Sequence, residues 1–392
     1  MSRTLFIKSC CLFSIFFLAS CASTNLTPLQ KGNERLEEDE QRIWNRSKEE
    51  EALIDKSELI YHDSVLTGYV NNVTQKLVSH LPPSETLTFR VQVIKNPMLN
   101  AFTYPNGIIY IHTGILAKME NESQLATLLA HEMTHATHRH ATQNFRSVKN
   151  NAGFFSIFSL ATAPFGIYGA IANLLGEIGT LASISGYSQE LETEADNTGF
   201  DLMISAGYDP REAPKLFEHI AHDLKDEDEK EPFFFGSHPK IESRIKNYNK
   251  FLKNRHLDTL TAAMNDTFMT KVLPLILLNT DMDIFSGRFG SAGRSIGHYF
   301  QYDSLNGLAH YYMGQVYERR EKEKSTDNAE KEYTLAIIDQ PGLAEPYKAL
   351  GLIHMKQGKK EQARTELEKY IVLSPDAKDR NYIEQYILSL QH

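Results

Sequence analysis

The chain has 392 residues, of which 41% are hydrophobic and 23% are charged, and its formal net charge is −9. This length is enough for two or three domains, and the composition is that of a globular protein and not of a disordered or fibrous one. The negative charge gives no electrostatic support to nucleic-acid binding, so we expect no nucleic-acid partner.

Residues 1–20 have the features of a bacterial lipoprotein signal peptide. A short basic start is followed by an apolar run from Cys10 to Ser20 that is too short for a spanning helix. Small residues then precede Cys21, which resembles the bacterial lipobox and predicts cleavage before Cys21 and a lipid on its thiol. The alternative is an ordinary signal peptide with a coincidental cysteine. Ala22 after the cysteine resembles outer-membrane lipoproteins of Gram-negative bacteria.

The three cysteines all fall within the first 21 residues. A mature chain lipidated at Cys21 therefore has no disulfide and no cysteine-ligated zinc site. Residues 21–40 are polar, and we interpret them as a tether between the lipid and a folded domain.

Two helices and two strands are predicted between residues 39 and 112. Apolar residues recur at helical spacing from Asp39 to about His80, which predicts the two helices. Residues 86–94 alternate apolar and polar side chains, as in a half-buried strand, and a second strand is predicted at 108–112. The second strand either offers an exposed edge to an extended peptide or is a buried central strand.

The sequence His131-Glu132-Met133-Thr134-His135 lies in a helical pattern from about residue 122 to 145. Positions i and i+4 share one helix face, so both imidazoles can bind one tetrahedral zinc ion. Glu132 reaches the open coordination position, where it can act as a general base. This motif also occurs by chance on surface helices, so a third ligand is needed. His140 lies away from the ligand face and is expected to be either a structural residue or a support for the ligands.

The segment from Asn150 to Gln189 is rich in Gly and Ala and carries one charge, Glu177. Part of it is long enough to cross a bilayer, but a single crossing would separate His131 from a downstream ligand. We therefore expect a helical hairpin that packs on the catalytic domain or dips into the membrane. A transmembrane segment is the alternative.

A further helix is predicted from Ser188 to about Gly207. Glu192 and Asp196 lie one turn apart on the same face of this helix. Acidic residues on a helix usually face solvent. After an H-E-x-x-H helix, however, such a pair fits a third zinc ligand and a carboxylate that orients a histidine ligand.

Several ordered motifs between about residues 40 and 250 resemble the zinc metallopeptidases of the HtpX and CAAX-prenyl-protease type. Beside the motifs above, they are Asn100-Ala101-Phe102 with Pro105-Asn106-Gly107, Thr113-Gly114, Arg139-His140, and Ser237-His238-Pro239 with Arg244-Ile245. The resemblance is strongest to the periplasmic members, the beta-barrel assembly-enhancing proteases and related outer-membrane lipoprotein proteases. One departure is Gln189, where the family usually has Arg.

The resemblance implies roles for individual residues. His131, His135 and Glu192 would bind one zinc ion per chain, and Glu132 would be the general base. Asp196 would support the ligands from behind. Glu190 and Glu194 fit less well than Glu192, because neither has an Asp four residues later.

The resemblance also implies roles for two residues later in the chain. His238 would be a reversible metal ligand that holds the enzyme latent. Arg244 would stabilise negative charge that develops during catalysis. The acidic run at 223–231 and the phenylalanines at 233–235 form either a mobile lid or a charged loop with an apolar anchor.

Two segments after residue 300 align with each other at the spacing of tetratricopeptide repeats. The matching pairs are Gly314 with Gly351, Ala329 with Ala363, and Pro341 with Pro375. Small residues at such positions let paired helices pack closely, and stacked pairs leave a concave face for a partner. The alternative is a plain helical hairpin.

The sequence thus predicts an α+β, mainly α fold, in which a zincin-like metallopeptidase domain with a small sheet (41–255) precedes tetratricopeptide-like repeats (256–392). The expected function is zinc-dependent proteolysis in periplasmic quality control, with a lipid anchor in the outer membrane. Unfolded or stalled outer-membrane proteins are the expected substrates, and an assembly machine is the expected partner of the repeats. The alternative is a non-proteolytic periplasmic chaperone or scaffold with a structural or latent zinc site.

Overall fold

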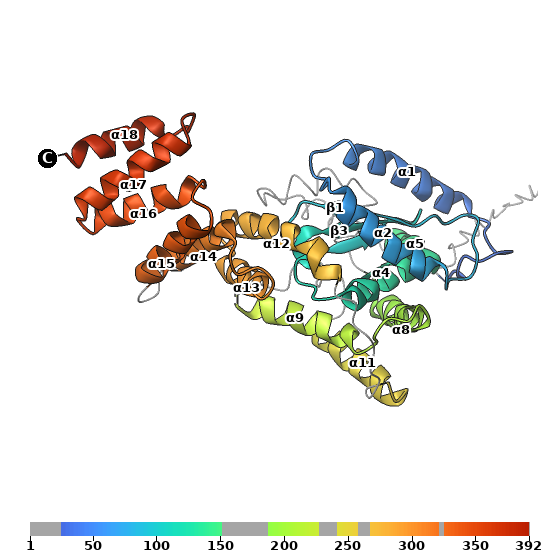
Figure 1. Cartoon of the computed structure of the whole chain (residues 1–392). Helices are drawn as coiled ribbons and strands as arrows, with labels where there is room; N and C mark the ends of the chain where they lie inside the picture. The colour runs from blue at the N-terminus through green and yellow to red at the C-terminus, as the bar shows by residue number, and fades with distance from the viewer. Residues whose placement is uncertain (1–24, 151–186, 227–240, 258–266, 321–324, 392) are drawn as a thin grey trace, which may run out of the picture.

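The computed structural model describes residues 25–150, 187–226, 241–257, 267–320 and 325–391 (Figure 1). These residues form a mainly helical protein with a small three-stranded sheet. The predicted signal peptide with Cys21, most of the Gly-rich segment, residues 227–235 of the segment predicted as a lid or a charged loop, and His238 lie outside the described residues. Within the described parts, no helix is both long and apolar enough to cross a membrane.

The two helices predicted at the N-terminal side are α1 (Glu38–Ile54) and α2 (Ser64–Val78). Asp63 caps α2, because its side chain accepts hydrogen bonds from the backbone N–H groups of the first turn. One face of α2 is buried, with Leu66, Val70, Val73 and Leu77 at helical spacing. These two helices confirm the periodicity seen in the sequence.

The sheet contains β1 (Arg90–Ile94), β2 (Ala101–Thr103) and β3 (Ile108–His112), in the order β1-β3-β2. β3 pairs with β1 in parallel and with β2 in antiparallel orientation. The idea that residues 108–112 offer a free edge is therefore wrong, since β3 is the central strand. Every side chain of β3 is buried, with Ile109 and Ile111 in one core cluster and Ile108 and Tyr110 in another.

Two features of the sheet differ from those expected. β1 begins at Arg90 and not at residue 86, and β2 was not among the predicted strands. A strand of three residues is too short to produce an alternating pattern, so only its pairing with β3 reveals it.

The motif lies in α4 (Glu122–Thr137), which follows the short α3 (Thr113–Leu116). The expected continuous helix to residue 145 is wrong, because α4 ends at Thr137 and a separate helix, α5 (His140–Asn150), follows. Arg139 between them has a φ of 60°, a left-handed conformation that interrupts the helix. The Arg139 guanidinium forms a buried ion pair with Glu40 of α1, and its Nε donates to Oε1 over 2.8 Å.

The predicted helix from Ser188 is α8 (Gln189–Ser205), followed by α9 (Glu212–Asp226) and α11 (Ile241–Asn254). α8 packs closely along α4. Gly199 permits this approach, because a Cβ atom at this position would lie 2.9 Å from the backbone nitrogen of His131. The absence of a side chain here brings the acidic face of α8 next to the motif.

Helices continue after residue 266, and consecutive helices pack on one another. Their bounds are α12 (Thr267–Phe285), α13 (Phe289–Tyr299), α14 (Gly307–Arg319), α15 (Ser325–Asp339), α16 (Glu345–Lys356), α17 (Lys360–Leu373) and α18 (Arg380–Ser389). α14–α18, which we call the helical arm, extend away from the sheet (Figure 1). Tyr333 packs on Gly314 and Leu367 on Gly351. The tetratricopeptide assignment stays a prediction.

Candidate metal centre

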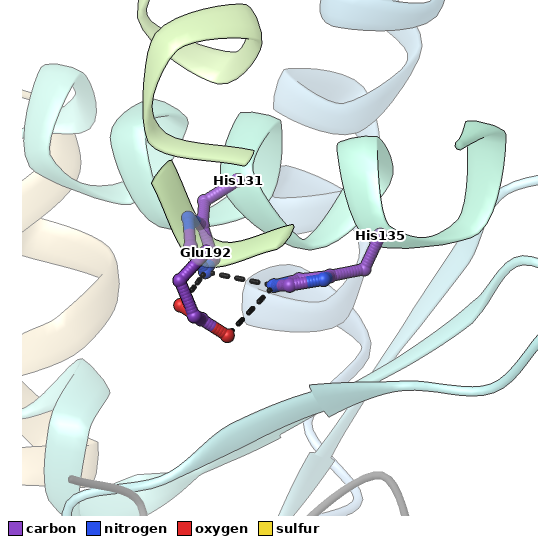
Figure 2. A group of neighbouring side chains, drawn as sticks. All are labelled: His131, His135 and Glu192. Carbon is purple, nitrogen blue, oxygen red and sulfur yellow. Dashed lines mark hydrogen bonds and ion pairs between the residues drawn. The ribbon is translucent and has the colours of Figure 1, made fainter. Parts of the chain in front are cut away.

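Three side chains that are distant in sequence converge between α4 and α8. His131 and His135 come from α4, and Glu192 comes from α8; Figure 2 shows that all three point to one place. The two Nε2 atoms are 3.0 Å apart. Each lies 3.5 Å from a carboxylate oxygen of Glu192. All three residues are buried.

This donor set fits a divalent transition metal. Two imidazole nitrogens and a carboxylate oxygen are ligands that zinc accepts, with bonds of about 2.1 Å. Ligand atoms on a tetrahedron of that size lie about 3.4 Å apart, close to the separations observed here. Among the described residues, only His131, His135 and Glu192 form a group that could hold a metal ion.

His131 is oriented by a buried charged group behind it. Its Nδ1 lies 3.1 Å from Oδ1 of Asp196, one turn after Glu192 on α8. A carboxylate only accepts hydrogen bonds, so it favours the tautomer with the proton on Nδ1. The lone pair of Nε2 then faces the metal position. Tyr248 on α11 donates a hydrogen bond to the same Oδ1 over 2.8 Å.

Asp196 stays ionised despite its burial. Burial alone would raise the pKa of the Asp196 carboxyl, but the positive charge of Arg244 and hydrogen bonds from His131 and Arg244 hold this pKa well below its usual range. The guanidinium Nε of Arg244 donates to Oδ1 over 3.1 Å. The buried anion and the buried cation therefore neutralise each other.

The position of Arg244 does not fit the catalytic role expected of it. Its Nη2 lies 3.0 Å from Nδ1 of His131, on the side of the ring that faces away from Glu192. The Arg244 side chain is fully buried and stacks over the ring of Phe217 at 4.1 Å. Arg244 therefore supports Asp196 from behind the centre. The family resemblance implied a role for Arg244 in the site, but it did not indicate the side of His131 on which Arg244 lies.

His135 is supported by neutral aromatic groups. Its Nδ1 lies 2.9 Å from Nδ1 of His140, the first residue of α5. Burial, with smaller effects of His138 and His131, lowers the pKa of His140 to about 3, so that its ring is neutral and can accept this hydrogen bond. His140 therefore contacts a residue of the candidate metal group without being a member of that group. Tyr187 stacks on the other side, with ring centroids 4.0 Å apart.

Glu132 lies beside the three ligands and is held from the sheet. The hydroxyl of Thr103, at the end of β2, donates a hydrogen bond to Oε2 of Glu132 over 2.8 Å. Within the described parts of the chain, Oε1 of Glu132 is buried and has no hydrogen-bond partner. One oxygen of this carboxylate is therefore fixed, and the other remains available to a proton.

Comparisons with known proteins agree with this arrangement. Residues 64–251 match the model of peptidase family M48. The chain carries a peptidase family M48 domain. This is the family that the sequence motifs resemble, so that expectation is confirmed.

Curated relatives of the M48 domain include a beta-barrel assembly-enhancing protease from Escherichia coli (strain K12), which is 27% identical over 225 residues; these cover 56% of this chain and 46% of the relative. The mitochondrial metalloendopeptidase OMA1 of Schizosaccharomyces pombe is 31% identical over 192 residues, with 49% and 54% covered. That of Arabidopsis thaliana is 34% identical over 142 residues, with 36% and 27% covered. The match to this chain covers about half the length of the first two relatives and about a quarter of the third.

The sequence did not identify several residues that surround the candidate metal centre. They are Thr103, Tyr187, Gly199 and Tyr248. Only Gly199 had a signal of its own, as a glycine inside a predicted helix, which often marks a close approach. Glu190 and Glu194, which fitted the ligand role less well, are exposed and lie outside the cluster.

Proposed function

We propose that this chain is a zinc-dependent endopeptidase. The observation that carries the proposal is the convergence of His131, His135 and Glu192 beside Glu132 within an M48 domain. Three protein ligands leave one position of a tetrahedral ion open, as catalytic zinc sites do. A structural site would have a fourth protein ligand, and among the described residues the cluster has three members.

The protein's own groups have defined tasks in this reaction. His131, His135 and Glu192 would hold the zinc ion, which would supply a water molecule of lowered pKa and polarise the scissile carbonyl. Oε1 of Glu132 takes the proton of the attacking water and later passes it to the leaving amine. Asp196 keeps the proton of His131 on Nδ1, and His140 holds the ring of His135 in place.

The substrate would bind along β2. This strand pairs with β3 on one side, and none of the other described strands covers its second side. β2 also packs on α4, and Thr103 at its end contacts Glu132. An extended peptide that adds to this edge would place a peptide bond over the metal position. The substrate-pairing edge that was expected at residues 108–112 is therefore proposed for β2 instead.

We further propose a periplasmic location and a lipid anchor at Cys21 in the outer membrane, as the leader sequence predicts. Unfolded or stalled outer-membrane proteins are the proposed substrates, in line with relatives named beta-barrel assembly-enhancing proteases. The helices after residue 256 would form tetratricopeptide-like repeats that recruit substrate or an assembly machine. His238 would bind the open metal position and keep the enzyme latent.

Cleavage of an unfolded outer-membrane protein by wild type, Glu132→Gln and His238→Ala tests the proposal. We expect Glu132→Gln to lose activity by a factor of about 100 or more while it keeps its zinc. Cleavage by His238→Ala alone would identify a latent protease. Wild-type activity in Glu132→Gln would refute the mechanism, and protection of the unfolded protein from aggregation without any cleavage would favour the chaperone alternative.

Metal analysis tests the ligands separately. Zinc content measured by mass spectrometry should fall in Glu192→Ala and stay at one per chain in Glu190→Ala, an exposed residue on the same helix. Undiminished zinc in Glu192→Ala would remove Glu192 from the ligand set.

A further inference from the structure

Thr103 contacts the carboxylate of Glu132 from outside α4. The bond from its hydroxyl to Oε2 is 2.8 Å long, and both side chains are buried. Because an ionised carboxylate only accepts hydrogen bonds, the hydroxyl must be the donor. The two oxygens of Glu132 therefore differ, since the described residues leave Oε1 without a partner.

We propose that Thr103 is a positioning residue, whose hydroxyl holds Oε2 of Glu132 so that Oε1 is the atom that moves the proton. This inference rests on the proposed function. A carboxylate beside three ligands can otherwise turn toward the ion and occupy its open position, because zinc accepts carboxylate oxygen. In the structure, Glu132 stays outside the group that could hold a metal.

The backbone around Thr103 is suited to this task. Thr103 faces α4, on the same side of β2 as Ala101, and its register partner on β3 is Ile109. The hairpin closes directly after it, since the Tyr104 nitrogen donates to the Ile108 carbonyl over 2.8 Å. β-branched side chains have restricted χ1 rotamers, so the position of the hydroxyl follows from that of the strand. A rigid strand thus fixes a group on a separate helix.

The turn of this hairpin is itself fixed to the rest of the domain. Gly107 has a φ of 91°, and its nitrogen donates to the Tyr104 carbonyl over 2.9 Å. A Cβ atom at Gly107 would lie 2.9 Å from the Thr88 carbonyl oxygen. Close packing against residues before β1 therefore limits movement of β2 along α4.

The substitution Thr103→Val keeps the shape of the side chain and removes the hydroxyl. We expect kcat on an unfolded protein substrate to fall about 10- to 100-fold, while KM and bound zinc stay unchanged. Thr103→Ser should restore most of kcat. Wild-type kcat in Thr103→Val, equal loss in both variants, or loss of zinc from Thr103→Val would each overturn the inference. The variants are made in wild type or in His238→Ala, whichever cleaves.

A second readout does not depend on turnover. The free energy of unfolding of the metal-free protein is measured for Thr103→Val, Glu132→Ala and the double variant. If the hydrogen bond forms, the change in the free energy of unfolding of the double variant should differ from the sum of the two single changes. A double variant whose change equals that sum would overturn the inference. The matched control is Thr74→Val, a buried threonine in α2 whose hydroxyl donates to the Val70 carbonyl over 2.9 Å; it should leave kcat unchanged.

Glu132→Gln distinguishes a failure of the proposed function from a failure of the role of Thr103. Wild-type activity in Glu132→Gln means that the proposed function fails, whatever Thr103 does. An inactive Glu132→Gln together with a fully active Thr103→Val removes only the role of Thr103.

Discussion

The metal centre and the helical arm are stabilised in different ways. Around the centre, charged and polar side chains are buried together, among them His131, Glu132, Glu192, Asp196 and Arg244. Among the described residues of α14–α18, the buried polar side chains are His310 and His354, which pair with Glu332 and Glu366 of the next helices. The other buried side chains between these helices are mostly small or apolar.

This difference follows from what each region has to do. A metal centre needs ionised groups away from water, and each such group is costly unless its partner is present. Helix stacking depends mainly on complementary shape. The centre should therefore be sensitive to changes of charge, and the arm to changes of volume.

The two regions can be followed separately. Trp44 is the single tryptophan of the chain, and it is buried in the core cluster shared with α2 and α4. Its fluorescence reports unfolding of the region around the metal centre, whereas far-UV circular dichroism reports the helices of both regions.

The largest effect is expected from Asp196→Asn, which leaves the Arg244 guanidinium buried without an anion. The free energy of unfolding followed by Trp44 should fall by about 3–5 kcal/mol. Zinc affinity should fall about 10- to 100-fold, because His131 loses the group that orients it. The control is Asp201→Asn on the same helix, where an exposed carboxylate pairs with Arg255. If both variants lose the same free energy of unfolding, burial of the ion pair between Asp196 and Arg244 has no special role.

A smaller loss is expected from Gly199→Ala. Alanine favours a helix over glycine by about 1 kcal/mol, but the new methyl group would meet the backbone of α4, which cannot turn aside as a side chain can. We expect a net destabilisation of about 2 kcal/mol together with weaker zinc binding. Gly68→Ala in α2, where a Cβ atom meets nothing within 4 Å, should be neutral or stabilising. A higher free energy of unfolding in Gly199→Ala would show that α8 can move away from α4 without loss of stability.

Acid should destabilise the region around the centre. Burial lowers the pKa of His112 to about 3, whereas the unfolded chain takes up this proton near pH 6.5. Between these values the unfolded state binds more protons, so stability is full above pH 6.5 and falls as the pH falls. His112 should contribute a loss of about 2 kcal/mol between pH 7 and pH 5. In His112→Phe, Trp44 unfolding should depend less steeply on pH; an unchanged slope would contradict this assignment.

The smallest effect is expected in the arm. In Gly351→Ala, the new Cβ atom would lie 2.7 Å from the side chain of Leu367, which can adjust partly. We expect a loss of about 1 kcal/mol seen by circular dichroism, with zinc content and the Trp44 transition unchanged. Gly297→Ala in α13, where nothing lies within 4 Å, is the control. A shift of the Trp44 transition in Gly351→Ala would mean that the arm and the centre unfold as one unit.

Much of the site was visible in the sequence because helices repeat regularly. The spacing of His131 and His135 places both on one face of α4, and that of Glu192 and Asp196 does the same on α8. The break at Arg139 was not visible. Arg139 has a left-handed conformation and pairs with Glu40, which lies 99 residues earlier, and a local pattern does not record such a contact.

The amino-acid sequence by itself determined the motif, the family resemblance and most helices, since these depend on residues that are near each other along the chain. Tertiary structure decided that β3 is central, that Arg244 lies behind His131, and that Thr103 holds Glu132. The physical reason is that strand order, the side of a ring and a hydrogen bond between a strand and a helix are set by packing between distant segments. No periodic pattern along the chain records such contacts.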